Sequence, residues 1–124
     1  MGVTMQLPHD AVLLRIFFGE SHRHGHLPLY EAIVLKAREM QLAGATVIRG
    51  AAGFGHSSHI HTAKILRLSQ DLPIIVEIVD TAEKIEAFLP SIDGAIADGL
   101  ATVEKVQIRF YRSRSESAPT TKRS

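Results

Sequence analysis

The order of strand-like and helix-like segments along the chain most narrowly limits what it can fold into. Four segments are short, apolar and rich in β-branched or aromatic residues, which is typical of buried strands. They cover residues 11–18, 45–50, 72–80 and 103–111. Two longer segments, one after the first strand and one after the third, repeat apolar residues at helical spacing. The sequence therefore predicts the order β-α-β-β-α-β.

Each helical segment carries its own start and stop signals. Pro28 suits the first turn of the first helix, and Gly44 is a favourable stop. In the second segment, Asp80 and Glu83 have the spacing of a capping box at a helix start, and Gly99 marks the end. We therefore expect one helix between Pro28 and Gly44 and another between Asp80 and Gly99.

Two βαβ halves joined in this order predict an α+β protein with the ferredoxin-like βαββαβ sandwich. Its antiparallel sheet has the strand order 4-1-3-2, with strands numbered along the chain, and both helices cover one face. Side chains alternate along the first, third and fourth strands, so each strand has a wholly apolar face for the helices. In the last strand this face is expected to hold Val106, Ile108 and Phe110.

The second face of the predicted sheet is apolar apart from one charge on each of these strands. The charged residues are Arg15, Glu77 and Arg109. An exposed face with snorkelling side chains has the same composition. A face that mixes apolar and charged side chains nevertheless favours an interface between subunits.

The length of 124 residues fits a single domain that buries most of its apolar surface on folding. We expect a flexible N-terminus over residues 1–10 and a folded domain over residues 11–112. Residues 113–124 have almost no apolar content and predict a disordered tail. Residues 60–69 fit a short helix and a strand extension equally well.

Charge and hydropathy exclude several classes of protein. The formal net charge is +1, which argues against a nucleic-acid partner. No apolar run is long enough to span a bilayer, and the N-terminus lacks the pattern of a secretory signal. The chain has no cysteine, so it has no disulfide and no thiolate metal site. These features predict a cytoplasmic protein that does not insert into membranes.

Histidines gather in two polar loops, where their spacing fits a divalent-metal site. Alternating histidines share one side of an extended segment and could hold zinc, nickel or copper together. The candidate ligands are His22, His24, His26, His59 and His61. Against a metal site, only Glu20 adds a carboxylate near these histidines in the sequence, and histidine is also common in solvated loops.

Longer stretches of the sequence resemble a known family. They include AGATVIRGAAGFG, LSQDLPIIVEIVD and GLATVEKVQI. Over residues 11–111 the chain resembles the PII-like family of uncharacterised small proteins, which is related to the nitrogen-regulatory PII signalling proteins. The resemblance implies a ferredoxin-like subunit, a homotrimer with the sheets inside, and adenine-nucleotide binding in the clefts between subunits. It also implies a loop between the second and third strands that docks on a target protein, such as a transporter or a metabolic enzyme.

The resemblance also points to individual ligand-binding residues. Residues 44–47 and 53–55 look similar to the strand and the loop base that hold the nucleotide in PII proteins. Gly99 matches part of a later phosphate loop, but Leu100 stands where PII proteins have a lysine. AMP and ADP are therefore expected to bind at least as well as ATP. The implied residues are Thr46, Gly53, Phe54, Gly55, His56, His61, Gly99, Arg109 and Arg112.

These observations together predict a regulatory protein, not an enzyme. Glycines at positions 53 and 55 let the backbone approach an anion closely, although the end of a strand also accounts for them. A histidine-loop metal-binding protein is the first alternative. A small hydrolase is the second, since the chain holds Ser57, Ser58 and Asp71, but no motif places a nucleophile beside a base.

Overall fold

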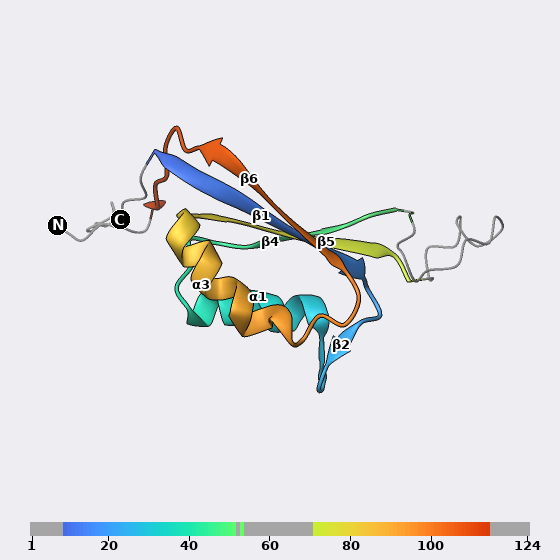
Figure 1. Ribbon diagram of the computed structural model, residues 1–124. Helices are drawn as coiled ribbons and strands as arrows, with labels where there is room; N and C mark the ends of the chain where they lie inside the picture. The colour runs from blue at the N-terminus through green and yellow to red at the C-terminus, as the bar shows by residue number, and fades with distance from the viewer. Residues whose placement is uncertain (1–8, 52, 54–70, 115–124) are drawn as a thin grey trace, which may run out of the picture.

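The computed structural model describes residues 9–51, 53 and 71–114. Its elements follow the predicted order with one small hairpin added after the first strand (Figure 1). They are β1 (Asp10–Gly19), β2 (Arg23–His24), β3 (Leu27–Pro28), α1 (Leu29–Glu39), β4 (Thr46–Arg49), β5 (Pro73–Asp80), α3 (Ala82–Asp93) and β6 (Leu100–Gln107). Among the described residues, no helix combines the length and the apolar character needed to cross a bilayer.

The main sheet is antiparallel with the order β4-β5-β1-β6. When β1, β4, β5 and β6 are numbered 1 to 4 along the chain, the order read from β6 is 4-1-3-2. The predicted ferredoxin-like arrangement is therefore confirmed. Helices α1 and α3 pack against one face of the sheet, and no helix of the described ranges covers the other face (Figure 1). The protein therefore has one covered face, toward α1 and α3, and one open face.

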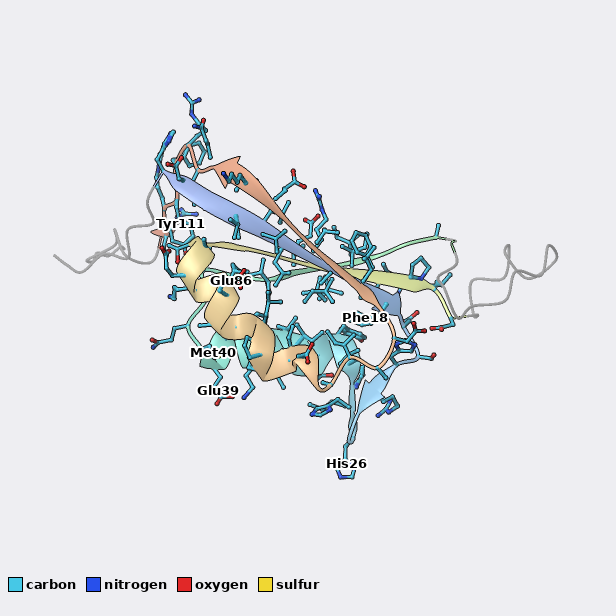
Figure 2. All side chains as sticks on the ribbon, viewed as in Figure 1. Phe18, His26, Glu39, Met40, Glu86 and Tyr111 are labelled. Atoms are coloured by element: carbon cyan, nitrogen blue, oxygen red, sulfur yellow. The ribbon has the colours of Figure 1, made fainter. Side chains whose placement is uncertain are left out.

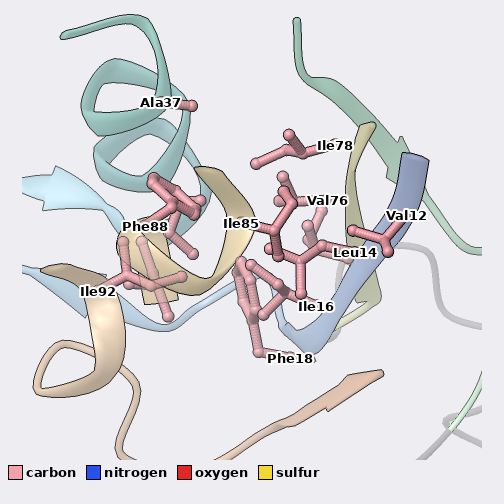
Figure 3. Close-up of a cluster of buried hydrophobic side chains, with 13 residues drawn as sticks. Val12, Leu14, Ile16, Phe18, Ala37, Val76, Ile78, Ile85, Phe88 and Ile92 are labelled. Atoms are coloured by element: carbon pink, nitrogen blue, oxygen red, sulfur yellow. The ribbon is translucent and has the colours of Figure 1, made fainter. Parts of the chain in front are cut away.

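The core lies between the two central strands and the helices (Figure 3). Alternate residues from Val12 to Phe18 of β1 and along β5 point toward the helices and are buried, as the alternation in the sequence predicted. The largest buried side chains from the two layers are Leu14, Ile16, Ile74, Ile78, Leu29, Ile33, Ile85 and Phe88. Burial of this apolar surface is the main force that holds the helices on the sheet.

The register of the last strand differs from the prediction. β6 runs over Leu100–Gln107, and Val103 lies opposite the core residue Leu14. Val106 is opposite Ala11, so it lies on the open face, not on the covered face as predicted. β6 begins three residues earlier than expected, but the position of its first residue does not decide which side chains face the helices. The register of its pairing with β1 decides this.

The same register changes which charge lies on the open face. Ile108 and Phe110, predicted to face the helices, follow the end of β6, and so does Arg109. The charge that β6 contributes to the open face is Glu104, which pairs in register with Leu13 of β1. The predicted assignment of Arg109 to this face is therefore wrong.

The first helix is shorter than its sequence signals predicted. α1 begins at Leu29, with Pro28 as its N-cap, and ends at Glu39, well before Gly44. Gln41 turns the chain with a φ of 61°, in the left-handed region. This early turn brings Leu42 back against the core, which a continuing helix would not do.

The second helix begins one residue later than predicted. Thr81 is its N-cap, and the Thr81 hydroxyl accepts a hydrogen bond from the Lys84 amide at 3.1 Å. Asp80 is instead fully buried, and its carboxylate accepts hydrogen bonds from the amides of Ala43 at 2.8 Å and Thr81 at 2.7 Å. The helix ends at Asp93, not near Gly99.

Candidate functional site

A network of three charges lies at the centre of the open face. Arg15 of β1 donates from Nε to Glu77 on β5 at 2.9 Å and from Nη1 to Glu104 on β6 at 2.7 Å. The hydrogen bond to Glu77, together with the neighbouring charge of Glu104, raises the pKa of Arg15 above its ordinary value. The register sets Arg15 directly opposite Glu77, as predicted from the strand order. The part of Glu104 in the network was not predicted.

Apolar side chains surround this network on the open face. Those on the two central strands and Val106 of β6 are partly buried, whereas the other two on the edge strands are exposed, Leu100 at 59% and Ile48 at 40%. The residues are Leu13, Phe17, Ile48, Ile75, Val79, Leu100 and Val106. A broad apolar surface with charges at its centre is typical of a protein interface.

The predicted loop base lies at the end of the sheet where β4 stops and β5 begins. The Gly50 amide donates to the Pro73 carbonyl at 2.8 Å. A Cβ atom on Gly50 would approach Cγ of Pro73 to 2.7 Å, and one on Gly53 would approach it to 3.1 Å. Both glycines therefore let the chain pass closely over Pro73. The other predicted loop residues, namely Phe54, Gly55, His56, His59 and His61, lie outside the described residues.

An ion pair at this end of the sheet was not predicted. Arg49, the last residue of β4, contacts Oε2 of Glu20 through Nε at 2.9 Å and Nη2 at 2.6 Å. The hydrogen bond to Glu20 raises the pKa of Arg49, with a smaller contribution from Tyr30. The only sequence signal for this pair is the position of Arg49, a cation immediately before the glycine-rich segment.

The remaining predicted ligand residues lie at different places along the sheet. Thr46 begins β4 and faces Glu77, whereas Gly99 precedes β6 and packs so closely that a Cβ atom would lie 2.7 Å from the Phe17 carbonyl. Arg109 and Arg112 follow the far end of β6. Because an eight-residue strand spans about 25 Å, one chain does not bring these arginines to Gly53 or Gly99.

The segment after β6 crosses the end of the sheet that carries the two arginines. The Tyr111 hydroxyl donates to the Ala43 carbonyl at 3.0 Å, and Tyr111 lies beside the N-terminal end of α3 (Figure 2). The guanidinium of Arg112 lies 4.4 Å from the ring centroid of Phe110, a cation–π contact on a largely exposed ring. This segment therefore presents cations and aromatic surface to the solvent.

The histidines of the β2–β3 hairpin do not form a metal site in the described structure. His22 stacks on Phe18, with ring centroids 6.2 Å apart. His24 is exposed on β2, and His26 points away from the sheet at the tip of the hairpin (Figure 2). No three histidine or carboxylate side chains gather closely enough to hold a metal among the residues that the structure describes.

Asp71, a candidate residue of the hydrolase alternative, contacts the backbone of the segment that follows β1. Its carboxylate accepts a hydrogen bond from the Ser21 amide at 2.8 Å and lies against Gly19. Ser57 and Ser58, the nucleophiles of that alternative, lie outside the described residues.

A groove of about 640 Å³ runs between α3 and β6 on the covered side of the sheet. Its walls are mostly apolar, with the carboxylates of Glu86 and Asp93 at its edge. Gly99, a predicted ligand residue, belongs to its lining, whereas the other predicted ligand residues do not.

Comparison with known proteins assigns the chain to a family. Residues 11–108 match the family DUF190, described as "Uncharacterized ACR, COG1993". The chain belongs to the DUF190 family. A UPF0166 protein of Aquifex aeolicus (strain VF5) is 42% identical over 98 residues, which cover 79% of this chain and 92% of that protein. The UPF0166 protein MJ1524 of Methanocaldococcus jannaschii is 33% identical over 66% of this chain and 75% of its own length.

Solved structures extend the comparison from this DUF190 chain to PII-like proteins. CPII from Thiomonas intermedia K12, solved bound to ADP and bicarbonate, has a TM-score of 0.58 and 16% identity over 80% of this chain and 88% of that chain. A putative PII-like signalling protein from Thermus thermophilus, TTHA0516, has a TM-score of 0.56 and 20% identity over 84% of this chain and 93% of that chain. At these identities the comparison establishes the fold, and the resemblance to the PII-like family is confirmed.

Proposed function

We propose that this DUF190 protein is a PII-like regulatory protein that binds an adenine nucleotide, or a similar anionic metabolite, in clefts between the subunits of a homotrimer. The bound state is reported to a partner protein, and no reaction is catalysed. The observation that carries the proposal is the shared fold with CPII, a nitrogen regulatory PII-like protein solved with ADP and AMP. The PII-like resemblance of the loop base adds to it.

The open face of the sheet supports assembly into a trimer. It carries a band of apolar side chains around the Arg15 network, and neither of the described helices, α1 and α3, covers that side (Figure 1). Packing the open faces of several copies together would remove this apolar surface from water, which is the dominant driving force of association. It would also remove the charge network from water. The hydrogen bonds of the network would then have to remain intact, because a buried charge without a partner is costly.

The positions of the predicted ligand residues support a site between chains. Gly53 and Gly99 lie at one end of the sheet, and Arg109 and Arg112 lie at the other. A ligand that contacts both groups must therefore take them from two different copies. In the proposed site, backbone amides near Gly53 approach the anion, Thr46 lies near its base, and an arginine of another copy neutralises its charge.

The proposed signal is a change in the conformations available to the loop between β4 and β5. A ligand shifts such an equilibrium only if it makes contacts in one conformation that it lacks in another. The expected recipient is a protein such as a transporter or a metabolic enzyme, as the PII-like resemblance implies. The folded domain of residues 11–112 supplies both the assembly and the site in this proposal.

Calorimetry on the full chain tests the proposed function. We expect ADP and AMP to bind the wild type at least as tightly as ATP, and Gly55→Val to abolish binding because its side chain excludes the close approach of the backbone. Gly94→Val is the matched control, since a Cβ atom there meets nothing within 4 Å and Gly94 has an ordinary φ of −70°. A wild type that binds Zn²⁺ but no nucleotide would contradict the proposal in favour of the metal-binding alternative.

A further inference from the structure

The pair formed by Arg49 and Glu20 lies at the end of the sheet that carries the proposed loop base, with Arg49 opposite the core residue Ile74, but it has no part in the function argued so far. Arg49 ends β4, directly before Gly50, and Glu20 follows the end of β1. The β5 strand runs between them, so the pair bridges three strands at one end of the sheet. Gly53, the described part of the proposed loop base, packs on Pro73 at this same end.

The chemistry of the pair leaves room for a second anion. Both contacts go from Nε and Nη2 of Arg49 to the same oxygen of Glu20, whereas a guanidinium carries five N–H donors. The two side chains are 51% and 32% exposed, so an anion in solvent can reach the guanidinium. Arginine binds phosphate through paired donors more readily than any other side chain.

We propose, resting on the function above, that Arg49 holds the anionic group of the ligand and that Glu20 competes with that group for the guanidinium. Arg49 supplies this cation from the same chain as Gly53, whereas Arg109 and Arg112 can reach the same end of the sheet only from another copy. The carboxylate of Glu20 repels an incoming anion, and the repulsion grows with the anion's charge. The pair thereby favours ligands with few negative charges.

The exchange of partners also connects the ligand to the β2–β3 hairpin. The backbone amide of Glu20 donates a hydrogen bond to the Leu72 carbonyl at 2.8 Å, and the hairpin begins a few residues later. When the anion binds the Arg49 guanidinium, Glu20 loses its ion pair with β4. The turn that leads into the hairpin is then held by fewer contacts.

Four variants of the full chain, titrated calorimetrically with ADP, AMP and adenosine, test this inference. Glu20→Gln removes the competing charge and should tighten ADP binding about 2- to 5-fold, the range of an exposed ion pair. Arg49→Gln should weaken ADP binding about 10-fold or more, and Arg49→Lys should restore part of it. Arg38→Gln, an exposed arginine at the end of α1, is the matched control and should change nothing.

Adenosine separates a binding role from a structural one. It carries no anionic group, so its affinity should be the same in all variants that retain the wild-type melting temperature. If the wild type binds ADP and both Glu20→Gln and Arg49→Gln bind it equally well, the inference is overturned while the proposed function stands. If the wild type binds none of the three ligands, both fall. Should Arg49→Gln fail to fold, unchanged ADP affinity in Glu20→Gln is enough to overturn the inference.

Discussion

The two faces of the sheet use the same strands in different ways. On the covered face, alternate residues of β1 and β5 are fully buried by α1 and α3. On the open face, the intervening residues of the same strands from Leu13 to Phe17 and from Ile75 to Val79 remain partly exposed around the network of Arg15, Glu77 and Glu104. A single chain therefore buries the central strands on one face and leaves the other face with the composition of an interface. Stability should depend on the first face, and assembly on the second.

The largest contrast is expected between two adjacent leucines of β1. Leu14 points into the core and has no exposed surface, whereas Leu13 lies on the open face. Leu14→Ala should lower the free energy of unfolding by about 3–5 kcal/mol, because it leaves a cavity in a packed core. Leu13→Ala should weaken assembly and cost much less in unfolding at low protein concentration. Chemical denaturation of both variants measures the difference; equal losses would show that the two faces do not differ.

The buried carboxylate of Asp80 should come next in size. It accepts hydrogen bonds from the amides of Ala43 and Thr81, and its removal leaves both donors without a partner in the interior. Asp80→Ala should therefore cost about 2–4 kcal/mol of unfolding free energy. Asp80→Asn keeps an acceptor oxygen and should cost less. A loss no larger for alanine than for asparagine in denaturation experiments would mean that these hydrogen bonds contribute little.

The charge network of the open face should affect assembly more than folding. Glu77→Gln removes one of the two carboxylate charges that accept hydrogen bonds from Arg15 and, in a desolvated interface, should raise the dissociation constant of the assembly about tenfold or more. Glu86→Gln, on α3 at the other side of the sheet, is the control. Sedimentation at several concentrations measures both. Because the raised pKa of Arg15 lies in the alkaline range, its charge should persist from about pH 6 to 9, and Arg15 itself should add no pH dependence there.

The smallest effect is expected where the helix layer ends and neither face is involved. Gln41 has a φ of 61°, which a residue with a Cβ atom adopts at a cost. Gln41→Gly should raise the unfolding free energy by about 0.5–1 kcal/mol and leave assembly unchanged. The backbone carbonyl of Gln41 still accepts the hydrogen bond from Lys84 in the variant. A lower melting temperature would show that the Gln41 side chain contributes more than its backbone strain costs.

The covered face could be predicted from sequence because its pattern has one solution. Every second residue on the helix side is apolar from Val12 to Phe18 in β1 and from Ile74 to Ile78 in β5, so only one orientation buries them all. The last strand has no such pattern: Leu100, Val103, Val106 and Ile108 occupy both parities of the segment. Its register depends on pairing with β1, which is a tertiary contact, and the prediction for its faces was therefore wrong.

The parts of the candidate site differ in the same way. The glycines at the loop base were visible as residue types whose backbone has special freedom. The ion pair of Arg49 and Glu20 could not be predicted in this way. Glu20 lies 29 positions from Arg49 in the sequence and contacts it only because the strand order β4-β5-β1 brings the two together. The start of α3 was missed by one residue because Asp80 and Thr81 are both good N-cap residues, and the burial of Asp80 decided between them.

The mass of the native particle, measured by light scattering across micromolar concentrations, tests the central claim most directly. If the open face is an interface between subunits, the wild type should have the mass of three chains, and Glu77→Gln should dissociate at a higher concentration than the wild type. A wild type with the mass of one chain at every concentration would contradict the account, since the open face would then be an ordinary exposed surface.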